Sequence, residues 1–210
     1  MKKLFMNDKF FLTMVVFGFI GSVICAIFYA IPSLEDFDLA STSFFILEGA
    51  CLISLYLSFK NHAKNVMKGM MGALLAAMLL DCTCWLNTYF GPDTVFSCIA
   101  IALNAVLFID HFIINGERRS KPVNVRINQV VVCLLSIVYV AWDASWALSY
   151  PLGIITVAAV SSSIHCIGVI ATVVCVESRL DAYRIDREKA GWTEEKGYPE
   201  GYVHAHDRTE

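Results

Sequence analysis

The sequence predicts an all-α membrane protein with six transmembrane helices. Of its 210 residues, 57% are hydrophobic and 17% are charged, whereas soluble domains average about 45–50% apolar and about 25% charged residues. The apolar residues gather in six blocks of about 20 residues, the length that a helix needs to cross a bilayer. All 16 Lys and Arg residues lie outside these blocks. We therefore expect one membrane domain followed by a short polar tail.

The apolar blocks define the expected spans, which are residues 10–31, 40–59, 69–90, 94–114, 129–149 and 152–176. A signal peptide is the alternative for the first block, but its apolar core should be about 7–15 residues long and end at a small-residue cleavage site. This block is longer and has no such site. The transmembrane domain is thus residues 1–176. Residues 177–210 are expected to form a cytoplasmic tail that is helical at its start and disordered beyond.

The basic residues predict the orientation. They lie in the head, the second loop, the fourth loop and the tail, and none lies in the first, third or fifth loop. Because Lys and Arg are retained on the cytoplasmic side, we expect both termini in the cytoplasm and a bacterial plasma (inner) membrane as the location. Each external turn has a tyrosine shortly before a proline: Tyr29 and Pro32, Tyr89 and Pro92, Tyr150 and Pro151. The helices are therefore expected to form three antiparallel hairpins.

Four ionisable residues lie deep within the predicted spans, namely Glu48, Asp81, Asp143 and His165. A charge at the bilayer centre costs about 2.5–3.5 kcal/mol on insertion scales, so such residues are functional candidates by default. No Lys or Arg lies in a span, so His165 is the only base expected to face three acids. The remaining negative charge predicts a pocket for a small cation or a proton. The alternative is that individual acids are protonated and hydrogen-bonded to a neighbouring helix.

Helical spacing places aromatic side chains beside these acids. Asp81 shares a helix face with Trp85, and Asp143 shares one with Tyr139 and Trp146. The faces of such rings suit an organic cation. The full set of expected ligand- or proton-binding residues is Glu48, Asp81, Trp85, Asn104, Tyr139, Asp143, Trp146 and His165.

The eight cysteines all fall inside apolar blocks, and none lies in an external loop, where an oxidising compartment would favour disulfides. We expect them to be small packing residues. The ligand spacing typical of zinc sites is absent, and no motif identifies a cofactor. No basic run resembles a nucleic-acid footprint. The expected partners are therefore the lipid bilayer, a small cationic ligand, and a second copy of the chain or a cytoplasmic protein.

A short likeness to a known family begins in the third span. Residues 80–86 read LDCTCWL, and Asn104 follows on the next span. This pattern resembles the multi-helix membrane sensory region that precedes bacterial diguanylate cyclases and histidine kinases. The resemblance covers the third and fourth spans. It implies a sensory role and carries over no functional residue.

Three functions fit these features. The preferred one is binding or transport of a small cationic solute or protons through an acidic intramembrane pocket. The first alternative is a membrane sensor or accessory subunit that passes a signal to a cytoplasmic partner. The second is an intramembrane hydrolase that uses two carboxylates as acid and base. The chain has no nucleophile elbow and no His-Glu-x-x-His motif, so we expect that it is not an enzyme.

Overall fold

The computed structural model describes residues 2–30, 39–88, 92–114, 122–149 and 153–189, and nearly all of them are helical. Six helices are long and apolar enough to cross a membrane, as the sequence predicts. They are α2 (Asp8–Ala30), α3 (Leu39–Lys60), α4 (Lys64–Thr88), α5 (Pro92–Ile109), α6 (Pro122–Ser149) and α7 (Ile154–Lys189). A short helix α1 (Lys2–Phe5) precedes them, and a π-helical segment, η1 (Asp110–Ile114), extends α5. The all-α prediction is confirmed for these residues, which include no strand.

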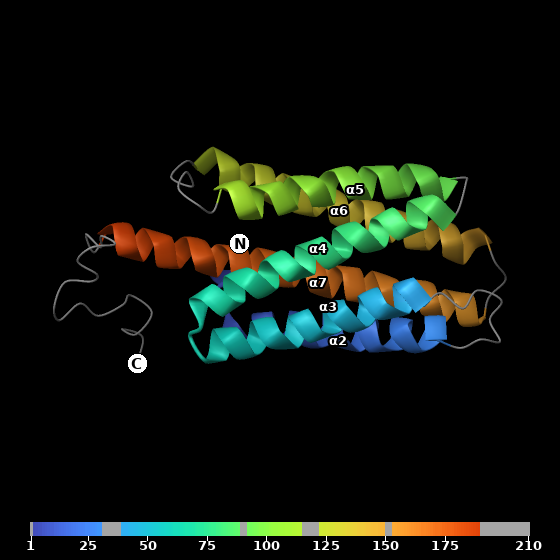
Figure 1. The fold of residues 1–210 in the computed structure, drawn as a ribbon, viewed down its shortest axis with the longest axis horizontal. Coiled ribbons are helices and arrows are strands. Elements are labelled where there is room, and N and C mark those ends of the chain that lie inside the picture. The colour runs from blue at the N-terminus through green and yellow to red at the C-terminus, as the bar shows by residue number, and fades with distance from the viewer. Residues whose placement is uncertain (1, 31–38, 89–91, 115–121, 150–152, 190–210) are drawn as a thin grey trace.

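The spanning helices lie side by side along the long axis of the molecule (Figure 1). Each packs against the next one in the chain, and α7 packs against α2, so that the six close into a ring. α4 and α7 also touch across the ring. Both helices contribute buried side chains to the main hydrophobic core, among them Leu74 and Met78 of α4 and Val169 and Val173 of α7. The order of the helices around the ring therefore follows their order in the chain.

One end of the bundle holds every Lys and Arg of the described residues. The start of α2 and the end of α7 both lie there (Figure 1), as do the turn between α3 and α4 and the start of α6. The residues are Lys2, Lys3, Lys9, Lys60, Lys64, Lys68, Arg126, Arg179, Arg184, Arg187 and Lys189. We call this the basic end, and the end at which α3, α5 and α7 begin the non-basic end.

Two helices, α6 and α7, extend furthest beyond their predicted spans. α6 begins at Pro122 rather than at residue 129, and proline suits the first position of a helix because its missing N–H would have no intrahelical partner there. α7 does not stop at residue 176 but continues without a break to Lys189. Its 36 residues correspond to about 54 Å at about 1.5 Å per residue. Residues 190–210, which include most of the predicted tail, lie outside the described residues.

The turn between α3 and α4 is held by a left-handed residue at the helix end. The Ala63 N–H donates to the Ser58 carbonyl at 2.8 Å, and the His62 N–H donates to the Phe59 carbonyl at 3.0 Å. These two bonds define a Schellman motif, in which the residue after the helix adopts a left-handed conformation. That residue is His62, with a φ of 54°. Glycine adopts this conformation without steric cost, whereas histidine does not.

Glycines allow α2 and α7 to approach until their backbones touch. A Cβ atom on Gly168 would lie 2.3 Å from the Gly18 nitrogen, and one on Gly21 would lie 2.7 Å from the His165 Cα atom. Real Cβ atoms do not come this close to a backbone. Small residues are common where membrane helices pack tightly, because they permit van der Waals contact between backbones. This contact sets the position of His165 relative to α2.

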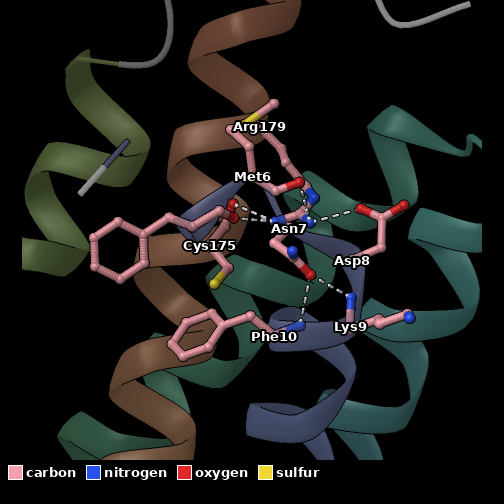
Figure 2. A network of polar contacts seen from close by, with 8 residues as sticks. Met6, Asn7, Asp8, Lys9, Phe10, Cys175 and Arg179 are labelled. Carbon is pink, nitrogen blue, oxygen red and sulfur yellow. Dashed lines mark hydrogen bonds and ion pairs between the residues drawn. The ribbon is translucent and has the colours of Figure 1, made fainter. Parts of the chain in front are cut away.

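Arg179 links the basic end of α7 to the start of α2 through hydrogen bonds (Figure 2). Its guanidinium donates to the Phe5 carbonyl at 2.6 Å and to the Asp8 carboxylate at 2.9 Å, and it also contacts the carbonyls of Met6 and Cys175. It lies 4.7 Å from the ring centroids of both Phe11 and Phe59. The sequence placed Arg179 among the cations of the tail. The structure instead buries it between two aromatic rings.

Candidate functional site

A buried acid and a buried imidazole meet near the middle of the bundle. The Nε2 atom of His165 on α7 lies 2.6 Å from the Oε2 atom of Glu48 on α3, and both side chains are about 95% buried or more, at 3% and 5% exposure. The other ring nitrogen, Nδ1, lies 2.8 Å from the Gly18 carbonyl of α2. The Phe45 ring packs edge-on against the imidazole at 5.3 Å. We call Glu48 and His165 the central pair.

The partners of His165 fix how many protons the central pair holds. A carbonyl oxygen only accepts hydrogen bonds, so Nδ1 carries a hydrogen that it donates to Gly18. At 2.6 Å, Nε2 and the Glu48 oxygen also require a proton between them. That proton makes the pair an imidazolium with a carboxylate, or an imidazole with a carboxylic acid. The pair is neutral in both forms, and its two forms differ only by the transfer of one proton.

One of the other two predicted acids, Asp143, interacts with the central pair, and Asp81 lies near the same thiol. Asp143 on α6 accepts a 2.7 Å hydrogen bond from the Ser163 hydroxyl of α7 and interacts electrostatically with His165. The carboxylates of Asp143, Glu48 and Asp81 all lie within electrostatic range of one thiol, that of Cys25. The three predicted acids therefore converge on one region of the bundle.

Glu48 and His165 lie deeper in the bundle than Asp81 and Asp143. Glu48 and His165 lie about 14 and about 16 Å from the non-basic ends of α3 and α7, taking about 1.5 Å per residue. Asp81 and Asp143 lie nearer that end, at about 10 and about 9 Å along α4 and α6. The acids thus occupy the middle and the non-basic half of the bundle.

A second polar group links α4, α5 and α6. The Asn104 side-chain amide donates to the Tyr139 hydroxyl at 3.0 Å and to the Cys82 sulfur at 3.5 Å, and the Tyr139 oxygen and Cys82 sulfur are 3.0 Å apart. We call these three residues the carboxamide triad. Asn104 is fully buried. Cys82 lies within electrostatic range of both Asp81 and Glu48, so the triad adjoins the acids.

The triad leaves one strong acceptor without a hydrogen bond. The Asn104 Oδ1 atom is buried and has no hydrogen-bond partner among the described residues, and the same holds for the hydroxyls of Ser97 and Thr172. A buried polar atom without a partner costs about 1–3 kcal/mol. In a membrane interior no bulk water can reduce that cost. Each of these atoms is therefore a place where a donor would be stabilised.

Two of the aromatic residues selected from the sequence, Tyr139 and Trp146, lie on α6. Tyr139 stacks in parallel with Trp142 at 6.5 Å, and Trp142 stacks with Phe96 of α5 at 6.3 Å. Trp146 is half-buried on α6. The side chain of Trp85 lies outside what the structure describes. The ring wall beside the triad is thus built by Tyr139, Trp142 and Phe96.

A second histidine–glutamate pair, absent from the predicted set, lies at the basic end. His111 of η1 is 1% exposed, and its Nδ1 atom lies 3.1 Å from the Glu177 Oε1 atom of α7. Its Nε2 atom lies 2.9 Å from the Lys68 carbonyl of α4. We call it the basic-end pair. It repeats the arrangement of the central pair, with one ring nitrogen on a backbone carbonyl and the other on a glutamate.

Besides His165, the structure buries two basic side chains that the predicted set did not include, His111 and Arg179, and both contact groups at the basic end. The sequence also assigned every cysteine to packing, whereas Cys82 takes part in a hydrogen-bonded group. The cysteines that the structure describes are all free thiols. Among the described residues, no three His, Cys, Asp or Glu side chains form a group that could hold a metal ion.

Comparisons with protein-family models, with curated proteins and with solved structures find no match to this chain.

Proposed function

We propose that this chain is an integral membrane protein that binds or transports protons or a small cationic solute at the polar groups in the centre of its helix bundle. One observation carries the proposal: Glu48 and His165 share a proton in a fully buried pair, while Asp81 and Asp143 add further acidic groups nearby. Ionisable residues inside membrane proteins commonly mark ion pathways and proton relays. A neutral pair beside two more acids provides the capacity to accept positive charge.

The basic-end pair supports a role for protons in particular. It is a second proton-sharing pair, and α7 carries one member of each, His165 and Glu177. Along the helix these residues are about 18 Å apart. Glu177 is 19% exposed, whereas Glu48 is 5% exposed. The basic-end pair can therefore exchange protons with water more readily than the central pair.

The proposal includes an orientation and a location. The six helices would form three antiparallel hairpins in a bacterial plasma membrane, with both termini in the cytoplasm. The concentration of Lys and Arg at one end of the bundle supports this orientation, since basic residues are retained on the cytoplasmic side. A fluorescent protein fused after residue 210 should be fluorescent in cells, and alkaline phosphatase fused at the same place should be inactive. The reverse result would invert the proposed topology.

Proton movement is tested by reconstituting the full chain in vesicles that contain a pH-sensitive dye. An imposed pH gradient should collapse faster than in empty vesicles, and Glu48→Gln should slow the collapse at least tenfold. Asp8→Asn is the matched control, because this carboxylate lies at the helix start, is 71% exposed and is outside the polar centre. Equal rates for Glu48→Gln and the unaltered chain would reject a role for the central pair.

A sensory role is the second candidate, and the continuous α7 favours it. His165 lies on the same unbroken helix as Lys189, so a change at the central pair can reach residues beyond the membrane. The resemblance of residues 80–86 to bacterial sensory regions agrees with such a role. Under this proposal, Glu48→Gln should alter hydrogen exchange of the amides of residues 181–189 at least threefold. If hydrogen exchange in residues 181–189 is unchanged and the vesicles show proton flux, the sensory role is rejected and transport stands as the function.

A further inference from the structure

Asn104 presents an acceptor that the chain itself does not use. Asn104 is 0% exposed, and its side-chain NH₂ group donates to Tyr139 and Cys82. These two bonds occupy both amide hydrogens. The Oδ1 atom on the other side of the carboxamide has no partner in the described part of the chain. The triad thus holds the side chain in place and leaves one acceptor available.

Other polar side chains in the spanning helices form hydrogen bonds within their own helix. The hydroxyls of Thr13, Ser58, Thr83 and Ser136 each donate to the carbonyl four residues earlier in their own helix. Hydroxyl groups in membrane helices commonly satisfy themselves in this way. An asparagine acceptor cannot do so, because a carbonyl has no hydrogen to donate to it and the helical N–H groups are already bonded. A donor for Oδ1 therefore has to come from another group.

The surroundings of Asn104 favour a donor that also carries positive charge. Cys82, bonded to Asn104, lies within electrostatic range of Asp81 and Glu48. Cys166 of α7 lies within electrostatic range of Cys82, Glu48 and Asp143. Acidic side chains from several helices therefore lie around the triad. Tyr139, bonded to the same amide, belongs to the ring stack with Trp142 and Phe96.

Resting on the proposed function, we infer that the cationic solute is an ammonium ion or a small amine that retains N–H hydrogens, and that Asn104 Oδ1 accepts one of them. An N–H group supplies the missing donor, the positive charge is stabilised by the neighbouring carboxylates, and aromatic ring faces attract alkylammonium groups. A quaternary ammonium ion lacks the donor. A potassium ion has no hydrogen to donate and gains less from an apolar ring wall.

The test uses the purified full chain in detergent, with methylammonium, tetramethylammonium and potassium chlorides at equal ionic strength. Methylammonium should raise the melting temperature in a saturable way, and the other two salts should not. Asn104→Leu should weaken methylammonium binding at least tenfold, whereas Asn104→Asp, which retains an acceptor oxygen, should preserve it. Thr172→Val is the control, because it removes a buried hydroxyl on another helix and should change the affinity less than twofold.

Equal stabilisation by all three salts, or none by methylammonium, overturns the inference even if Asn104→Leu does not fold. Wild-type affinity for methylammonium in Asn104→Leu overturns the role of this residue. The vesicle assay without amine separates this inference from the proposed function. If protons move in a Glu48-dependent way and methylammonium does not bind, the inference falls and the proposed function stands.

Discussion

His165 on α7 and Glu48 on α3 are 117 positions apart in the chain and form a 2.6 Å hydrogen bond in the middle of the bundle. The bond links two helices on either side of α2, which supplies the third partner, the Gly18 carbonyl. The central pair therefore joins the first, second and last spans.

The two members of the central pair should be strongly coupled energetically. We expect Glu48→Leu and His165→Phe each to destabilise the fold by about 3–5 kcal/mol, because each leaves a buried ionisable partner without its counterpart. The double variant should be about 1–3 kcal/mol more stable than the sum of the two predicts. Unfolding in detergent with increasing denaturant measures all three. Glu177→Leu is the comparison and should cost less, because Glu177 is partly exposed. Additive effects would show that the pair is not coupled.

Gly21 should tolerate no side chain. In Gly21→Ala, the new Cβ atom would lie 2.7 Å from three backbone or Cβ atoms of His165, so α2 and α7 must separate. We expect a loss of about 1–3 kcal/mol, as for other overpacked sites, measured as a lower melting temperature. Gly69→Ala is the matched control, because nothing lies within 4 Å of its Cβ position and alanine favours a helix by about 1 kcal/mol over glycine. Equal melting temperatures for the two variants would contradict the close contact.

Replacing Arg179 should destabilise the fold far more than replacing Asp8, its ion-pair partner. Arg179→Met removes four hydrogen bonds and both ring contacts, and we expect it to destabilise the fold by about 3 kcal/mol because hydrogen bonds from a charged donor are lost. Arg179→Lys should restore little of this, since an ammonium group lacks the planar fork of donors. Asp8→Asn should cost less than about 1 kcal/mol, because this carboxylate is exposed. Thermal unfolding in one detergent compares the three, and a larger loss in Asp8→Asn would contradict this ranking.

Replacing His62 by glycine should stabilise the fold. His62→Gly removes the steric cost of a left-handed backbone, which is about 1–2 kcal/mol for residues with a Cβ atom, and it should raise the melting temperature. His62→Ala retains the Cβ atom and should show no gain. If alanine stabilises the chain as much as glycine, the left-handed conformation is not the cause.

The sequence predicted the number and class of the helices because apolar length and the placement of charge are local properties. It missed features that depend on neighbours in space. Pro122 was assigned to a loop because residues 115–128 are polar, although proline begins α6 there. Arg179 follows the last apolar run by one turn, and only the packing of Phe11 and Phe59 around it explains its burial.

In the candidate site, too, the sequence predicted local properties and missed those that depend on neighbours in space. The sequence selected Glu48 and His165 individually by their depth, but their pairing depends on which helices adjoin α2. Asn104 and Tyr139 were both selected, whereas Cys82 was taken as packing because its thiol resembles a small apolar group. The basic-end pair arises from η1, whose π-helical turn brings His111 to Glu177 while the Phe112 ring covers Gly72. Helical spacing alone does not predict a π-helix.

The closed ring of helices has a consequence for how the chain is made. Of the six spanning helices, α2 is made first and α7 last, yet these two helices share the most extensive contact in the bundle. Until α7 is synthesised, Gly18 and Gly21 on α2 have no backbone to pack against, and Glu48 has no imidazole. Without α7, the other five helices would form an open arc in which Glu48 lacks its hydrogen-bond partner. Synthesis of α7 therefore supplies the backbone contact and the imidazole together, and the ring closes only after residue 168 has been made.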